Sequence, residues 1–383
     1  MLQMQKARPI GQELNPETYA IAKADMLIKG GNASGMKYGD TLDNDQFIGY
    51  EFDYIISNPP FGIDWKSEEE TVKKEHKLGF AGRFGPGLPN VGDGQLLFLL
   101  NGVKKLKENG RMTIIQNGSP LFSGDAGSGP SEIRKYLIEN DLLEAIIQLP
   151  TDLFYNTGIS TYIWLITKNK ADNRRGYVQL IDASNCYIKR RKNIGSKRVD
   201  LNNECIDLII EAYTSFENEK FIKDNLIVES KVFENEYFGF TKLTIETAMR
   251  DEKGNLILKK GVKQPVKGET DYECISLVDN LEEFIKENYT SINPNVFVDR
   301  KKDKIGYAIP FTRLFYEYKE PEKTEAILER IKKLTLKENK LISDCRKFPW
   351  WRNFTKPLNS AINLITHFQI APSSIYSLLM LVF

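Results

Sequence analysis

The chain has 383 residues, of which 41% are hydrophobic and 27% are charged, a composition that excludes a globally disordered protein and allows two or three domains. Lysine and arginine number 53 against 52 acidic residues, so only local patches could attract nucleic acid. Four cysteines without a CxxC pair and only two histidines predict no metal site, no disulfide framework and no histidine-centred catalysis. Because no apolar run reaches the ~18 residues of a membrane span, we expect a cytoplasmic protein without membrane contact.

Strand and helix signals alternate through the first half of the chain. A helix is predicted to begin at Pro16, with Asn15 as its cap, and to end at Gly30. Further along, apolar runs predict strands at 52–57, 112–116, 142–149 and 159–167, and amphipathic segments predict helices at 94–108 and 131–140. The run at 52–57 has the pattern of a buried strand. This alternation favours an α/β fold with a mostly parallel sheet covered by helices on both faces.

A basic stretch follows the last of these strands. Between Lys168 and Arg198 there are ten lysines and arginines and only two acids, Asp172 and Asp182. Such an excess is typical either of a surface that contacts phosphates or of a solvated loop at the end of a sheet. The sequence leaves both interpretations open.

The most informative motif is Asn58-Pro59-Pro60-Phe61, which comes directly after the predicted strand at 52–57. Ligands of open parallel sheets bind at the carboxyl ends of the strands. Two successive prolines fix the backbone, so the Asn58 side-chain oxygen and the Pro59 carbonyl offer two acceptors beside the ring of Phe61. Two acceptors would favour the pyramidal form of a planar amine, which is its reactive form. The motif therefore predicts a site that binds and activates a planar amino group.

The segment DYIISNPPFG resembles the catalytic loop of S-adenosylmethionine-dependent methyltransferases that act on amino groups. The wider sequence is similar to the modification (M) subunit of type I restriction–modification systems, from about Gly11 to about Asp344. The segments that carry this resemblance are GQELNPETYAIAKADMLIKG, YGDTL, DGQLLFLL, NGSPLFSGDAGSGPSEIRKYLIEND, AIIQLP and IGYAIPFTRLFYEY. Members of that family are adenine-N6 DNA methyltransferases, so the resemblance implies a Rossmann-like sheet, S-adenosylmethionine as cofactor and DNA as substrate.

The resemblance also implies roles for individual residues. Asn58, Pro59 and Phe61 would hold the target base, with Pro60 setting the loop. Glu13 matches the acid that binds the ribose hydroxyls of S-adenosylmethionine, and Asp40 matches the acid near the cofactor adenine.

The family pattern places a Gly-rich cofactor loop, with its strand and helix, before the position of Glu13. Only twelve residues precede Glu13 here, whereas such a unit needs about 25–30. We therefore expect a methyltransferase sheet truncated at its N-terminal strand, with an open edge. The glycines between Gly124 and Gly129 have their own place in the family pattern, so we do not expect them to replace the missing loop.

Four segments are predicted: a partial catalytic domain at 1–185, a mixed α+β region at 186–318, an amphipathic helix at 319–344 and an atypical tail at 345–383. The helix carries an apolar seam of Ile327, Ile331, Leu334 and Leu341 with charged flanks, which suits packing on its own domain or a partner helix. The resemblance favours the partner. The tail contains no acidic residue and has no periodic pattern.

Three functional hypotheses follow. The first is a site-specific adenine-N6 DNA methyltransferase that works with a specificity subunit, a restriction subunit and a second M subunit. The second is a catalytically inactive fragment that retains only DNA or specificity-subunit binding. The third is a methyltransferase of another planar amide or amine, such as a protein glutamine, which the long match beyond the sheet disfavours.

Overall fold

The computed structural model describes residues 8–318 and 321–346. The chain divides into two compact units, with the boundary between Phe315 and Tyr316. The first unit contains every strand of the described residues, and the second contains one described helix, α9 (Thr324–Arg346).

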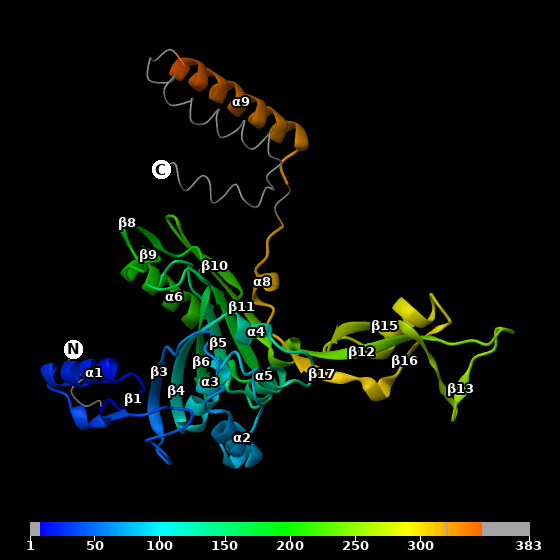
Figure 1. Ribbon diagram of the computed structural model, residues 1–383, viewed down its shortest axis with the longest axis horizontal. Helices are drawn as coiled ribbons and strands as arrows, with labels where there is room; N and C mark the ends of the chain where they lie inside the picture. The colour runs from blue at the N-terminus through cyan, green and yellow to red at the C-terminus, as the bar shows by residue number, and fades with distance from the viewer. Residues whose placement is uncertain (1–7, 319–320, 347–383) are drawn as a thin grey trace, which may run out of the picture. The chain divides into compact units, whose positions relative to one another are not determined.

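The centre of the first unit is a seven-stranded sheet (Figure 1). Its strands, in spatial order, are β10 (Glu219–Lys223), β11 (Leu226–Glu234), β7 (Tyr177–Asp182), β5 (Leu143–Gln148), β6 (Thr161–Thr167), β4 (Leu106–Asn117) and β3 (Phe52–Ser57). β3 is parallel to β4, and β5 is parallel to β7, whereas β6 runs antiparallel to both of its neighbours. Since β3, β4, β5, β7 and β10 share one direction, the predicted mostly parallel sheet is confirmed.

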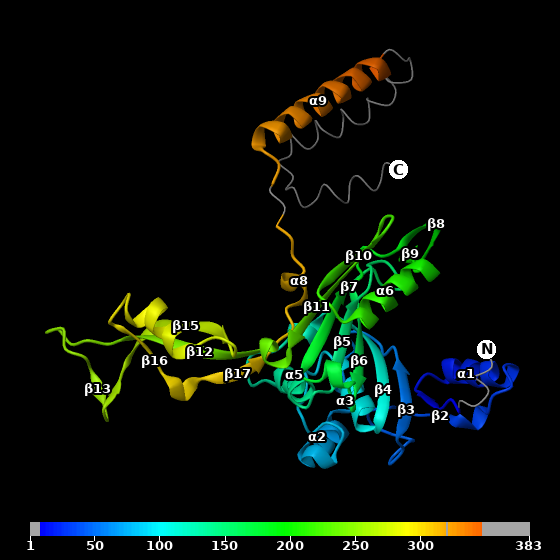
Figure 2. The same cartoon turned by 180° about the vertical axis from the view of Figure 1, so that it is seen from behind.

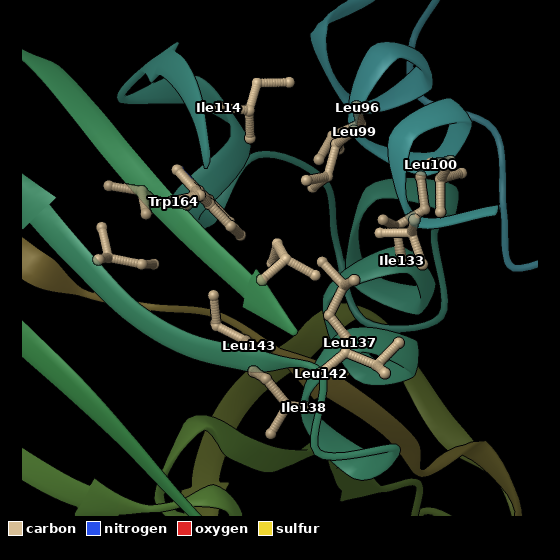
Figure 3. Close-up of a cluster of buried hydrophobic side chains, with 14 of the residues drawn as sticks. Leu96, Leu99, Leu100, Ile114, Ile133, Leu137, Ile138, Leu142, Leu143 and Trp164 are labelled. Atoms are coloured by element: carbon tan, nitrogen blue, oxygen red, sulfur yellow. The ribbon is translucent and has the colours of Figure 1, made fainter. Parts of the chain in front are cut away.

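Helices cover both faces of the sheet, as predicted. On one face, α3 (Gln95–Lys104) and α5 (Gly129–Glu139) pack against the strands around Trp164, which is fully buried. Figure 3 shows leucines of α3 and α5 converging with Trp164 and Ile114 of the sheet. On the other face, α6 (Asn203–Ser215) packs through Leu208 on Ile147 and Ile181.

The sheet continues beyond the boundary predicted at residue 185. β10, β11 and α6 all follow that position, yet they belong to the same sheet and to its second apolar cluster. The first compact unit therefore includes the mixed region as far as Phe315. The predicted tail at 345–383 lies outside the described residues, except for the last two positions of α9.

The predicted helix at 94–108 is too long, because α3 ends at Lys104 and β4 begins at Leu106. Leu106 is fully buried and pairs with Phe52 of β3. Gly110, expected to follow the helix, instead lies inside β4, where an added Cβ would come within 2.9 Å of the Phe52 carbonyl oxygen and the Leu106 side chain. A glycine at this position lets the two backbones approach closely.

The prediction that the segment at 52–57 is a buried strand is wrong. β3 pairs with β4 on one side only, and no strand of the described residues pairs with its other edge. Tyr54 and Ile56 are 77% and 88% exposed. β1 (Gly11–Glu13) and β2 (Met36–Tyr38) form a separate parallel pair, with α1 (Pro16–Ile28) between them in sequence. As far as residues 8–318 and 321–346 show, β3 thus has the open edge that the sequence predicts.

A second, smaller sheet extends from the first unit (Figure 2). It contains β12 (Gly239–Ala248), β15 (Pro265–Ser276), β16 (Val296–Val298) and β17 (Lys304–Tyr307), and the β13–β14 hairpin (Leu258–Lys259 and Val262–Lys263) lies between β12 and β15 in sequence. The fully buried guanidinium of Arg134 in α5 joins β17 to the central sheet's helices. It donates to the carbonyl oxygens of Tyr307, Pro120 and Ser123 at 2.6, 3.0 and 2.8 Å.

Helix α9 confirms the predicted terminal helix. Ile331, Leu334 and Leu341 of its apolar seam are 52%, 60% and 59% exposed. Across the described ranges, no helix combines the length and apolar character needed to cross a membrane.

Candidate functional site

The motif Asn58-Pro59-Pro60-Phe61 lies at the carboxyl end of β3, as predicted. Because β3, β4, β5 and β7 share one direction, their carboxyl ends lie along one edge of the sheet. The Asn58 side chain is exposed and the Pro59 ring is buried, so the proline anchors a loop from which the asparagine projects. Within the described part of the chain, neither the side-chain amide of Asn58 nor the backbone carbonyl oxygen of Pro59 takes part in a hydrogen bond. Both acceptors are therefore available to a ligand.

The loop after Phe61 is fixed by contacts that the sequence did not reveal. The Gly94 amide donates to the Ile63 carbonyl oxygen at 2.9 Å. Trp65 is buried, and its ring Nε1–H donates to the Asn90 carbonyl oxygen at 3.0 Å. Trp65 is the only apolar residue in the segment at 64–71, and this isolated aromatic residue is the sequence feature that could have indicated a buried anchor. The contacts hold the motif against the start of α3.

Gln95, the first residue of α3, joins this loop to the end of β4. Its side-chain oxygen accepts from the Asn117 amide at 2.9 Å, and its carbonyl oxygen accepts from the Gln116 side chain at 3.0 Å. Its Nε2 donates to Asp93 at 2.8 Å. Gln95 is buried, so this polar group is satisfied inside the protein. It positions the edge of the sheet rather than offering a group to a ligand.

Glu13 and Asp40 lie near the ends of neighbouring parallel strands. Glu13 ends β1 and pairs in register with Tyr38 at the end of β2, two residues before Asp40. The Glu13 carboxylate accepts from the Asn15 amide at 2.7 Å, and Asp40 accepts from the Leu42 amide at 2.7 Å. Each carboxylate is thus oriented by the turn that follows its strand and keeps further lone pairs for a ligand.

Electrostatics link Asp40 to the loop that follows Phe61. Burial raises the pKa of Glu68, and the nearby carboxylates of Asp40, Asp43 and Asp64 raise it further, against a backbone hydrogen bond that lowers it. Asp43 also accepts a short hydrogen bond from the Thr71 hydroxyl. The segment after β2 and the segment after the motif therefore carry carboxylates that repel one another.

The basic stretch at 168–198 divides into two parts. In the first part, the Lys170 ammonium is buried 2.6 Å from Asp141, and the Arg174 guanidinium lies 3.6 Å from the buried carboxylate of Glu144. These cations are structural. The second part forms a two-stranded ribbon of β8 (Ile188–Ile194) and β9 (Lys197–Asp200), which carries the other six cations that follow Arg175.

The glycines at 124–129 form a turn before α5. Gly124 and Gly127 have positive φ angles of 82° and 75°. Asp125 between them pairs with Lys242 of β12 at 2.8 Å, and this hydrogen bond lowers the pKa of Asp125. The Asp125–Lys242 pair therefore ties this turn to β12 of the smaller sheet.

A cavity of about 300 Å³ lies on the face of the sheet near α6. It is lined by Tyr54 and Ile56 of β3, Arg111 of β4, Glu144 of β5 and Tyr213 of α6, and by none of the predicted site residues.

The topology and the loop at the end of β3 define a Rossmann-like α/β protein with a candidate base-binding edge. A family model described as N-6 DNA Methylase matches residues 2–253, about two thirds of the chain. The chain belongs to this family.

The chain is also similar to several named proteins. The chain is 31% identical over 210 residues to the type I restriction enzyme MjaIX methylase subunit of Methanocaldococcus jannaschii, covering 54% of this chain and 36% of that protein. It is 33% identical over 184 residues to the HindI methylase subunit of Haemophilus influenzae, covering 47% and 39%. Among solved structures, a type I restriction-modification system methyltransferase subunit from Streptococcus thermophilus is similar, with 29% identity, a TM-score of 0.49 and coverage of 59% of this chain and 44% of that chain. The chain thus spans less than half the length of these relatives.

Proposed function

We propose that this chain provides the base-binding part of a site-specific adenine-N6 DNA methyltransferase, as the modification subunit of a type I restriction–modification system. The observation that carries the proposal is the Asn58-Pro59-Pro60-Phe61 loop at the carboxyl end of β3, in a member of the N-6 DNA methylase family. Two acceptors of this loop take part in no hydrogen bond among the described residues.

The chemistry follows from the groups on this loop. An adenine amine is a weak nucleophile because its lone pair is delocalised into the ring. The Asn58 Oδ1 and the Pro59 carbonyl oxygen accept its two N–H groups, and this favours the pyramidal nitrogen of the transition state. Phe61 stacks on the base. A base must leave the duplex to reach such a loop, and the exposed position of Asn58 permits this.

The residues fit the nucleoside half of the cofactor. Glu13 and Asp40, near the ends of adjacent parallel strands, present carboxylate acceptors suited to ribose hydroxyls and to an amino group. S-adenosylmethionine, when bound, supplies the electrophilic methyl group. The Gly-rich cofactor loop that the resemblance implies before Glu13 is not among the described residues, so these residues would hold only the nucleoside end of that molecule.

A second candidate function is binding of DNA or of a specificity subunit without catalysis. The open edge of β3 favours it, because Ile56 and Tyr54 remain exposed beside the site. Calorimetric titration with S-adenosylmethionine can exclude this second candidate. We expect weak or no binding by the isolated chain, and a low-micromolar affinity that Glu13→Ala abolishes would contradict this second candidate.

The proposed partners are DNA, a specificity subunit, a restriction subunit and a second copy of the modification subunit. Helix α9 is the proposed contact for the specificity subunit, because its seam is exposed along one face. Changing Ile331 and Leu334 to Asp should abolish co-purification with that subunit while the circular dichroism of the chain persists. The matched control changes Lys332 and Lys333 to Asp, because these two residues lie between Ile331 and Leu334 in the sequence. If the control disrupts the complex equally, the seam is not the contact.

Methyl transfer to duplex DNA tests the main proposal, measured with the chain supplied with the family's N-terminal Gly-rich part and with a specificity subunit. Asn58→Ala removes an acceptor that acts mainly in the transition state, so the rate should fall by about 10²–10³-fold. The unfolding midpoint should stay unchanged, because the Asn58 side chain makes no hydrogen bond in the described structure.

Asn288→Ala is the control, since this exposed asparagine in the small sheet's helical segment makes a single hydrogen bond, 3.0 Å long, to the Phe284 carbonyl oxygen. Equal rates for the two variants, or near-normal methylation by Asn58→Ala, would overturn the assignment of Asn58.

A further inference from the structure

The ribbon of residues 188–200, called here the basic ribbon, is a feature that the proposed methyl-transfer chemistry does not use. It contains six cations, at 189–192, 197 and 198, and one acid, Asp200. Asp200 lies 2.9 Å from Lys197 and is also paired with Arg190, and these contacts lower the pKa of its carboxyl group. Two of the six cations thus share one carboxylate, which offsets one of the six positive charges.

The other cations remain exposed. Lys189, Arg191 and Lys192 take part in no ion pair with any described residue, and all three are exposed. The Arg198 side chain is 67% exposed and lies 3.9 Å from Asp152, a long contact that water screens. Positive charge without an internal partner is therefore concentrated on this short ribbon.

The ribbon is held at the edge of the sheet that carries the Asn58 loop. It begins at Ile188, shortly after β7 ends at Asp182, and β7 runs in the same direction as β3 and β5. The amides of Ser196 and Arg198 donate to the carbonyl oxygens of Tyr155 and Asp152, both at 2.9 Å, in the loop that follows β5.

Further contacts make this attachment specific. The Lys197 ammonium lies 5.3 Å from the centre of the Tyr155 ring. Gly195 has a φ of 57°, and an added Cβ would come within 2.5 Å of the Tyr155 carbonyl oxygen. A cavity of about 280 Å³ lies between ribbon and loop, lined by Lys189, Arg190 and Arg198 on one side. The ribbon is thus fixed to the sheet rather than a solvated loop.

We propose that the basic ribbon binds the phosphate backbone of the DNA whose adenine enters the Asn58 loop. This proposal rests on the proposed function for the choice of DNA as ligand. The charge on the ribbon is complementary to phosphates, and its place along the same edge of the sheet would let one duplex contact both. The contact contributes affinity and register without reading sequence.

Equilibrium binding of the full chain to a duplex of arbitrary sequence, followed by fluorescence anisotropy from 50 to 200 mM salt, tests this proposal. Replacing Lys189, Arg191 and Lys192 with Gln should weaken binding about tenfold and lower the slope of log K against log salt by about 2–3, since each phosphate contact contributes about 0.9.

The matched control replaces Lys253, Lys259 and Lys260 with Gln. These lysines are exposed around the β13–β14 hairpin, and their replacement removes the same charge. An equal loss in this control would show that only net charge matters and would overturn the proposal. Unchanged DNA binding by the ribbon variant would also overturn the proposal. The same holds if that variant binds DNA normally but loses a protein partner.

A second measurement needs no variant. Acetylation of lysines in the wild-type chain, read by mass spectrometry, should be slowed by duplex DNA several-fold more at Lys189 and Lys192 than at Lys253, Lys259 and Lys260. Equal protection at both sets would overturn the proposal. Neither measurement needs cofactor or methyl transfer, so failure of the ribbon and failure of the Asn58 assignment give separate results.

Discussion

The interior of the seven-stranded sheet and its β3 edge are built from similar residues in opposite surroundings. Ile146 of β5 is fully buried between two strands and beneath helices, whereas Ile56 of β3 is 88% exposed. An apolar run therefore specifies a strand, but its neighbours decide whether the strand is buried. The candidate site lies at the β3 edge, where a strand has fewer neighbours. Substitutions at this edge and in the sheet interior should therefore have different consequences.

The largest expected effect is on stability in the interior. Trp164→Ala should lower the free energy of unfolding by about 3–5 kcal/mol, because the change leaves a cavity in the main apolar cluster. Chemical denaturation followed by circular dichroism measures this loss. Ile56→Ala at the β3 edge is the counterpart, expected to cost less than about 0.5 kcal/mol because the side chain is exposed. A large loss for Ile56→Ala would mean that the edge is covered.

A smaller effect, on binding rather than stability, is expected at the exposed end. Phe61→Ala should weaken binding of an extruded adenine by roughly 1–3 kcal/mol, through loss of stacking. The measurement compares affinities for a duplex with a mismatched target adenine and for one without it. Phe61→Tyr keeps the ring and should retain most of the affinity. If both variants bind alike, the ring does not stack on the base.

The smallest expected effect concerns the crowded carboxylates near Asp40. The pKa of Glu68 is raised in the folded state, so the folded protein binds this proton more tightly than the unfolded chain does. The resulting stabilisation is present below the pKa of the unfolded chain, and it is lost as the pH rises through the pKa of the folded protein. Glu68→Gln should therefore raise stability at pH 7.5, by less than about 0.5 kcal/mol after solvent screening, with a smaller gain near pH 4. Urea unfolding at the two pH values measures the difference. A gain that is larger at pH 4 would contradict the sign.

Local signals predicted much of the fold. Asn15 caps α1, with Pro16 as its first residue, and both lie where the sequence placed them. β3 ends at Ser57, so the Asn58 loop also lies at the predicted strand end. In each case, neighbouring residues are sufficient to fix the backbone.

Features that depend on distant residues were not predictable. Lys170 and Arg174 looked like part of a surface patch until Asp141 and Glu144 were placed beside them. The anchor of Trp65 on Asn90 spans 25 residues. The roles proposed for Asn58, Glu13 and Asp40 remain predictions, because they concern ligands rather than the fold.

The buried Arg134 has a consequence for the synthesis of the chain. Burial lowers its pKa to about 10, so the guanidinium is still charged at neutral pH and needs its acceptors. The carbonyl oxygens of Pro120 and Ser123 lie within 14 residues of Arg134 in the sequence, whereas that of Tyr307 is 173 residues further along. At about 5–20 residues per second, the ribosome delivers that acceptor on the order of 10–30 s after Arg134. During this interval Arg134 lacks one of its three acceptors, so the helix that carries it cannot complete its packing.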